Sequence, residues 1–206
     1  FSIAFLGTDG SGKSTLIENV RPVLEQMLHG PVHYEHLRPN LIPALAQLAG
    51  KPKKIGPTTN PHGGKQAGWV SSLFRFFYYY LDYVFGYWLK IYPILVKRQS
   101  LVIFDRYYYE YMIDQKRCAV WLIPGFARFF SWFIPKPDLI LCLGGDPEKI
   151  YARKPETSLD EVRRQVNELQ RFCHGNRRAV WIDTTGGIDE SKAAALAAIM
   201  ERMSAR

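Results

Sequence analysis

The chain has 206 residues, of which 47% are hydrophobic and 22% are charged, the composition of an ordinary globular protein of one domain. Its three scattered cysteines, Cys118, Cys142 and Cys173, suggest neither a disulfide framework nor a zinc site. The net charge of +8 favours anionic partners such as nucleotides, phosphorylated substrates, nucleic acid or acidic membrane surfaces.

Cysteine usage and the absence of a signal peptide pattern favour a reducing, cytoplasmic location. Cys142 lies in an apolar strand-like run and is expected to be a small core residue. The chain opens on Phe1, inside an apolar run and without a methionine, so we expect the natural chain to be longer.

The first predicted strand, Ser2–Leu6, is followed by the segment Gly7-Thr8-Asp9-Gly10-Ser11-Gly12-Lys13-Ser14, which fits the phosphate-binding P-loop pattern G-x-x-x-x-G-K-[ST]. Its glycines let the backbone turn tightly and aim N–H groups at phosphate oxygens. Lys13 is expected to reach the β- and γ-phosphates, and the Ser14 hydroxyl to ligate Mg²⁺. A helical pattern follows, as a P-loop requires, which disfavours the alternative of a glycine-rich turn that binds nothing.

Two segments after the second strand, Val32–Leu37, have unusual composition. Residues Gly50–Gly68 are rich in Lys, Pro and Gly and predict a long loop, which either meets an anionic acceptor or is a solvated linker. Residues Trp69–Lys97 predict a long aromatic helix with a kink or restart near Pro93. Its charged residues argue against a transmembrane helix.

The long helix carries a helical stripe that we expect to pack mainly in the core, beside the acceptor pocket. A second aromatic run spans Trp121–Phe133. The alternatives to core packing are a homodimer face or, with less support, contact with a membrane or lipid-linked substrate. The stripe consists of Val70, Leu73, Phe74, Phe77, Leu81, Val84, Phe85, Trp88, Ile91 and Leu95.

Three further strands are predicted at Leu101–Asp105, Leu139–Leu143 and Val180–Asp183. Alternation of strands and helices predicts an α/β fold with three layers, in which helices flank a five-stranded parallel sheet. Ligands of such sheets bind at the carboxyl ends of the strands. The P-loop, Arg38 and the pair Asp105-Arg106 all follow strands directly, which predicts a single phosphate-rich site.

Before the last strand, Ser158 and Glu161 form a capping box that opens a helix. Arg153, Lys154, Arg163, Arg164 and Arg171 stand around it. These cations are expected either to close as a lid over transferring phosphates or to form a solvated basic helix.

Several segments, in the same order and spacing, resemble the thymidylate kinase family of P-loop kinases. The P-loop variant runs from Gly7 to Thr15, and Leu37-Arg38-Pro39 resembles the family's arginine turn after strand two. Val102–Tyr107 resembles its Asp-Arg motif, and Asp146–Glu148 with Ala152–Lys154 resembles the run into its lid. Ile182–Thr184 resembles its last strand near adenine. The resemblance spans nearly the whole chain and implies a single P-loop kinase domain over residues 1–206, with a lid at about 148–165.

The resemblance implies ATP and Mg²⁺ as cofactors and a role for each matched residue. The ATP phosphates would be held by the P-loop residues Gly7, Asp9, Gly10, Ser11, Gly12, Lys13, Ser14 and Thr15. Ser14 and Asp105 would hold Mg²⁺, and Asp9 would face an acceptor hydroxyl. Arg38 and Arg106, with Tyr107 beside them, would bind the acceptor, and Arg153 would neutralise developing charge. Such chemistry is mostly positioning and electrostatic stabilisation.

The acceptor half departs from the family. The family reads thymine with an arginine on the long helix, where this chain has Leu81-Asp82-Tyr83-Val84. After Arg106 the chain is rich in tyrosine, and Asp82, Glu110 and Asp114 add carboxylates to the predicted substrate site. Carboxylates suit sugar hydroxyls better than a phosphate. A nucleoside monophosphate is therefore the acceptor implied by resemblance, and a carbohydrate used in polysaccharide synthesis is the alternative.

Two other classes of function compete with a kinase. A P-loop ATPase or ATP-binding regulator would hydrolyse ATP without a small acceptor, but no water-positioning glutamine is evident. A nucleic-acid-binding module would use the positive charge, but the basic residues are dispersed and no nucleic-acid motif occurs, so we expect no nucleic-acid partner.

Overall fold

The computed structural model describes residues 1–43, 68–97, 100–115, 118, 120, 122–123 and 125–205. The chain divides into two compact units. The sheet unit comprises Phe1–Leu37, Ile94–Tyr107 and Lys136–Arg206, and the helical unit comprises Arg38–Pro93 and Tyr108–Pro135. Most of the predicted loop Gly50–Gly68, and Trp121 of the second aromatic run, lie outside the described residues.

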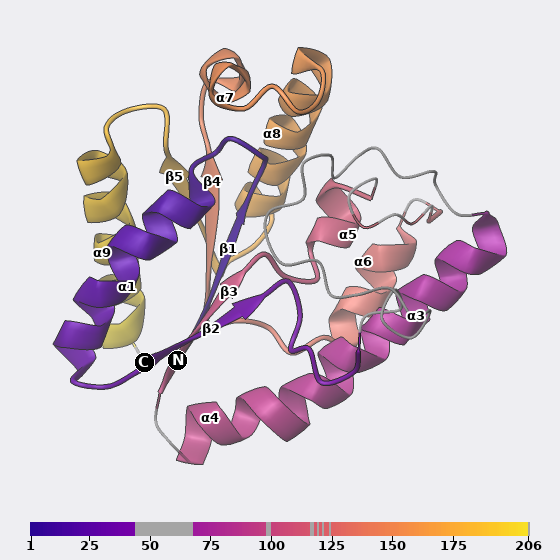
Figure 1. The fold of residues 1–206 in the computed structure, drawn as a ribbon, viewed down its shortest axis with the longest axis horizontal. Coiled ribbons are helices and arrows are strands. Elements are labelled where there is room, and N and C mark those ends of the chain that lie inside the picture. The colour runs from indigo at the N-terminus through magenta and orange to yellow at the C-terminus, as the bar shows by residue number, and fades with distance from the viewer. Residues whose placement is uncertain are drawn as a thin grey trace. The chain divides into compact units, whose positions relative to one another are not determined.

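The sheet unit is built on five parallel strands in the order β2-β3-β1-β4-β5 (Figure 1). This confirms the predicted α/β fold and all five strands, with ends that shift by at most one residue. The strands are β1 (Ser2–Gly7), β2 (Val32–His36), β3 (Leu101–Asp105), β4 (Leu139–Gly144) and β5 (Ala179–Asp183).

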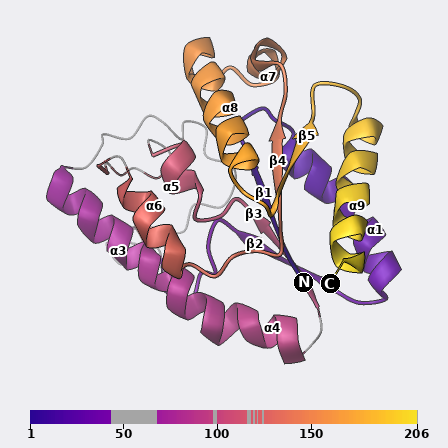
Figure 2. The ribbon, with the colours of Figure 1, turned by 180° about the vertical axis from the view of Figure 1, so that it is seen from behind.

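Helices cover both faces of the sheet. Helices α1 (Lys13–Leu28) and α9 (Ile188–Ser204) lie on one face, and α8 (Leu159–His174) lies on the other, with α7 (Pro147–Arg153) preceding it (Figure 2). Every residue of β1 is buried because side chains that alternate along it meet a helix on each side. Cys142 in β4 is fully buried, as predicted for a core residue.

The helical unit is held together largely by aromatic rings. It contains α3 (Trp69–Gly86), a π-helical turn at Tyr87–Ile91, α5 (Glu110–Ile113), α6 (Phe126–Phe130) and a 3₁₀ turn at Ser131–Phe133. The Phe76 ring is fully buried at its centre and packs edge-to-face on Tyr108, Tyr111 and Phe126, with centroids 5.2 to 6.2 Å apart. Such ring pairs add to simple burial of apolar area.

The predicted interruption at Pro93 takes the form of the π-helical turn before it. The Tyr92 N–H donates to Tyr87 O, five residues back, before the helix continues as α4 (Tyr92–Lys97). Proline lacks the N–H that an α-helix would use here and crowds the preceding turn. A wider turn relieves that conflict, and π-turns of this kind are rare elsewhere.

The prediction that the stripe of the long helix packs mainly in the core is wrong for most of its members. Phe74 is 65% exposed and Trp88 is 54% exposed, whereas α3 buries Ser72, Phe76, Asp82 and Tyr83. Aromatic residues occur nearly all round α3, so the sequence pattern fits several faces and the ring cluster around Phe76 selects one of them. Among the described helices, none is long and apolar enough to cross a membrane.

Candidate functional site

The P-loop connects β1 to α1 and takes the backbone shape that its glycines predict. Gly10 and Gly12 have φ values of 81° and 77°, a region that residues with a Cβ rarely adopt. A Cβ on Gly10 would lie 2.6 Å from Ile150 O. A Cβ on Gly12 would meet no atom within 4 Å. Gly12 is the N-cap of α1, so this open space lies beside the start of the helix. The loop therefore offers a site for an anion at the positive end of a helix.

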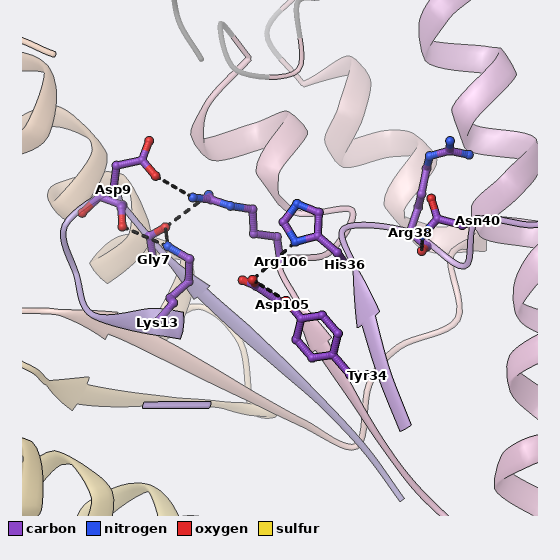
Figure 3. Close-up of polar contacts among 10 residues, drawn as sticks. Gly7, Asp9, Lys13, Tyr34, His36, Arg38, Asn40, Asp105 and Arg106 are labelled. Atoms are coloured by element: carbon purple, nitrogen blue, oxygen red, sulfur yellow. Dashed lines mark hydrogen bonds and ion pairs between the residues drawn. The ribbon is translucent and has the colours of Figure 1, made fainter. Parts of the chain in front are cut away.

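Lys13 lies across this loop. Its Nζ donates to Gly7 O at 2.7 Å and to Thr8 O at 2.9 Å (Figure 3). Lys13 is thus only 7% exposed, and its ammonium group is held over the loop backbone. The buried hydroxyls of Thr8 and Ser11 have no hydrogen-bond partner among the described residues, whereas Ser14 is exposed in the first turn of α1. Unpaired donors of this kind are expected where a ligand completes the hydrogen bonding.

Asp105, at the end of β3, is held by two side chains of β2. Tyr34 Oη donates to Asp105 Oδ2 at 2.8 Å, and His36 Nδ1 lies 3.3 Å from the same oxygen (Figure 3). Burial acts to raise the pKa of Asp105, but the His36 and Tyr34 hydrogen bonds and the charge of Lys13 outweigh it and hold this pKa at about 2. Asp105 is therefore a carboxylate at neutral pH.

Arg106, the next residue, reaches back to the P-loop. Its Nη2 donates to Asp9 Oδ1 at 2.9 Å and its Nη1 to Gly7 O at 3.3 Å. The backbone of Arg106 has φ 71°, which is unfavourable for a residue with a Cβ. Its N–H nevertheless donates to Phe5 O at 2.9 Å and so keeps the strand register. The surrounding hydrogen bonds hold Arg106 in this unfavourable conformation.

A pocket of about 230 Å³ lies beside the P-loop within the sheet unit. Arg153, at the end of α7, donates to Thr184 O at 2.8 Å on the wall of this pocket. Thr15, in the first turn of α1, also lines this pocket. The pocket is lined by Gly12, Thr15, Leu16, Arg153, Thr184, Gly186, Ile188 and Ser191.

The remaining arginines of the predicted lid are paired with carboxylates. Arg163 bonds Glu148 at 2.9 Å, Arg164 bonds Glu161 at 2.7 Å and Arg171 bonds Glu168 at 2.9 Å. The predicted cap is confirmed, since Ser158 Oγ accepts the Glu161 N–H at 3.3 Å. These pairs favour the solvated basic helix over an arginine-rich lid, with Arg153 as the described arginine that lines the pocket.

The helical unit carries the predicted acceptor residues Arg38, Asp82, Glu110 and Asp114. The Arg38 guanidinium forms an ion pair with Asp82, donates to Ile42 O at 3.0 Å and lies 4.6 Å from the centre of the Tyr79 ring. Asp82 also accepts the N–H groups of Leu41 at 2.8 Å and Ile42 at 3.1 Å. This arrangement favours a positioning role for Asp82 over the direct substrate contact predicted from the sequence.

Three other predicted substrate residues are buried. Tyr107 of the sheet unit is fully buried, with its ring centre 4.9 Å from that of Phe104. Glu110 and Asp114 begin and follow the short helix α5 and are also buried. Their predicted contacts with an acceptor stay predictions.

The sheet unit thus brings together Asp9, Lys13, Asp105 and Arg106, all predicted as site residues (Figure 3). Sequence reasoning missed Tyr34 and His36. The available signal was a pair of polar side chains at alternate positions of β2, which place both on the same face of the sheet.

The side chains present fit a nucleotide with Mg²⁺. The site offers a cradle of N–H groups, a lysine, the exposed Ser14 hydroxyl and the carboxylate of Asp105. Mg²⁺ is held in proteins by one or two oxygen side chains together with substrate phosphates. The described residues contain no group of three or more His, Cys, Asp or Glu that could hold a metal ion.

Comparisons with known proteins agree with this architecture. No family model matches the sequence, and no curated protein matches it. Among solved structures, the chain is similar to the thymidylate kinase from Ehrlichia chaffeensis, with a TM-score of 0.61 and 16% identity over 97% of this chain and 98% of that one. An identity this low carries the fold and no further property. The chain has a thymidylate kinase-like fold, an α/β P-loop architecture.

Proposed function

We propose that the protein is an ATP- and Mg²⁺-dependent kinase that transfers the γ-phosphate of ATP to a small-molecule acceptor. The observation that carries this proposal is the assembly of Lys13, Asp105 and the Asp9–Arg106 pair around one P-loop, next to a pocket lined by Arg153 and Thr184. Hydrolysis of ATP would need a residue that positions water, and none is evident in the sequence, whereas an arginine held at the edge of the loop suits phosphoryl transfer to a second substrate.

Each residue has a task that its position supports. The P-loop N–H groups and Lys13 bind the phosphates, and the pocket beside Thr15 receives the rest of the nucleotide. Ser14 and Asp105 would hold Mg²⁺, which supplies charge neutralisation on the phosphates when bound. Arg106 is held by Asp9, so that its guanidinium has a fixed place at the loop before any substrate arrives.

The similarity to a thymidylate kinase supports a nucleoside monophosphate as acceptor. One observation favours a carbohydrate instead. Arg38, the residue predicted to hold an acceptor phosphate, already forms a buried pair with Asp82, and Glu110 and Asp114 add buried carboxyl groups to the same unit. A paired arginine attracts a dianionic phosphate less strongly than a free one.

The test is acceptor-dependent ADP release by the purified protein with ATP and Mg²⁺. The panel contains nucleoside monophosphates, nucleosides and neutral sugars, and the Lys13→Ala variant is the control. A kinase releases ADP with one acceptor class and forms a phosphorylated product that mass spectrometry detects. ADP release that no acceptor stimulates would support the ATPase alternative and would refute the proposal.

A further inference from the structure

Two residues outside every motif of the sequence converge on one oxygen of Asp105. Tyr34 and His36 occupy alternate positions of β2, so their side chains share a face of the sheet. The parallel register pairs His36 with Asp105 and Tyr34 with Ile103, which places both side chains on the face that carries the Asp105 carboxylate. Both reach Oδ2, at 2.8 Å from Tyr34 and 3.3 Å from His36.

The two oxygens of Asp105 are therefore unlike each other. Oδ2 has two partners, whereas Oδ1 is buried and has no hydrogen-bond partner among the described residues. Leaving a buried polar atom unpaired destabilises a folded protein, and more so when the group is charged. An orphaned oxygen in a native site is commonly completed by a water or an ion. The two donors from β2 thus decide which oxygen is left for a ligand.

Both neighbours are suited to donate. The Tyr34 hydroxyl donates to Oδ2, since an ionised carboxylate can only accept. For the same reason, His36 forms its hydrogen bond to the carboxylate when Nδ1 carries a proton. Because the terminal torsion of an aspartate is broad, two fixed donors restrict a carboxylate that would otherwise rotate.

We infer that Tyr34 and His36 are positioning residues that hold Asp105 by Oδ2 and reserve Oδ1 for the Mg²⁺ of the bound nucleotide. This inference rests on the proposed function. It adds two residues that neither the P-loop pattern nor the Asp-Arg motif contains. Neither residue touches the substrate in this role, since each acts on the metal through Asp105.

The experiment measures Mg²⁺-dependent nucleotide binding without turnover. A fluorescent, non-hydrolysable ATP analogue is titrated onto the full chain in EDTA and then at increasing Mg²⁺, for the wild type, Tyr34→Phe, His36→Ala and the double variant. Loss of such outer partners commonly lowers metal affinity roughly 10- to 100-fold, and we expect that rise in the Mg²⁺ needed by the double variant. Nucleotide affinity in EDTA stays at the wild-type value.

Two controls separate positioning from general damage to the fold. Tyr92→Phe removes a hydroxyl from a tyrosine whose exposure, 43%, equals that of Tyr34, and it leaves the Mg²⁺ dependence unchanged. His36→Asn keeps a donor near the place of Nδ1 and restores binding toward the wild type. Thermal denaturation checks that each variant is folded, and Tyr34→Phe alters a single oxygen.

The possible outcomes are distinct. Tyr34→Phe and His36→Ala proteins with the wild-type Mg²⁺ dependence overturn the inference while the proposed function stands. Equal losses of binding in EDTA and in Mg²⁺ also overturn it, because the residues then support the fold alone. A wild-type protein that binds no nucleotide at any Mg²⁺ concentration overturns the proposed function and this inference with it.

Discussion

The carboxylate of Asp9 and the guanidinium of Arg106 form an ion pair at 2.9 Å, although the two residues are 97 positions apart in the sequence. Asp9 lies inside the P-loop and Arg106 follows β3. The pair ties the P-loop to the end of the neighbouring strand. It also fixes the place of the Arg106 guanidinium beside the loop, because Arg106 is only 5% exposed.

Replacing Asp9 tests the purpose of this pair. Asp9→Ala removes one of the partners that orient the Arg106 guanidinium, and misplacing a reacting group by an ångström lowers the rate roughly 100-fold. We expect a fall in kcat of that order with little change in ATP affinity, whereas Asp9→Asn, which keeps an acceptor oxygen, lies between Ala and the wild type. Steady-state kinetics and nucleotide titration measure both quantities. An unchanged kcat for Asp9→Ala would refute the role of the pair.

The backbone of Arg106 gives a prediction about stability. At φ 71° a residue with a Cβ is strained by about 1–2 kcal/mol, and glycine relieves this strain. Arg106→Gly and Arg106→Ala lose the same ion pair, so their difference isolates the backbone. We expect the glycine variant to be more stable than the alanine variant by about 1 kcal/mol in urea denaturation. A more stable alanine variant would contradict the strain.

Lys13 carries the largest predicted effect on the chemistry. Removing one preorganised electrostatic group from a transition state costs roughly 10²- to 10³-fold in kcat, and we expect at least this loss for Lys13→Ala. Lys149→Ala is the matched control, since Lys149 is exposed on α7. Circular dichroism verifies that both variants retain the fold. Comparable rates for the two lysine variants would remove Lys13 from the mechanism.

The lowered pKa of Asp105 predicts a loss of protein stability in acid. Its pKa in the folded protein is about 2, below the ordinary value of 3.8. The carboxylate therefore stabilises the fold above pH 3.8, and this contribution disappears as the pH falls from 3.8 toward 2. The difference corresponds to about 2 kcal/mol.

Denaturation of the wild type and of Asp105→Asn between pH 7 and pH 2 checks this contribution. We expect the wild type to be the more stable protein at pH 7. The difference in the free energy of unfolding between the two proteins should decrease as the pH falls below about 4. A difference in unfolding free energy that stays constant over this pH range would show that Asp105 has no depressed pKa.

Replacing Asp82 is expected to lower the stability of the helical unit more than any other single substitution that we propose. Its side chain is fully buried and that of Arg38 is 9% exposed, so Asp82→Asn leaves a buried arginine without its counter-charge. Breaking such a pair costs about 3–5 kcal/mol. Glu168→Gln, which breaks the exposed pair with Arg171 on α8, is the control and is expected to cost less than about 1 kcal/mol. Equal effects in thermal denaturation would refute a structural role for Asp82.

The sequence alone determined the sheet and the backbone shape of the P-loop. Five apolar runs separated by helical patterns permit few arrangements other than a parallel sheet with helices on both faces, and Gly10, Gly12 and Lys13 are local requirements of a P-loop. The cap at Ser158 was predictable for the same reason, since it depends on residues three positions apart. These features follow from short-range geometry, and the structure confirms them.

Only the tertiary structure decided which side chains meet. The contact of Asp9 with Arg106, and of Tyr34 and His36 with Asp105, depends on the order β2-β3-β1 and on its register, which no local pattern encodes. The exposed face of α3 is a similar case. Its aromatic residues occur on nearly all sides, so hydrophobic periodicity could not choose the buried face, and packing around Phe76 chose it.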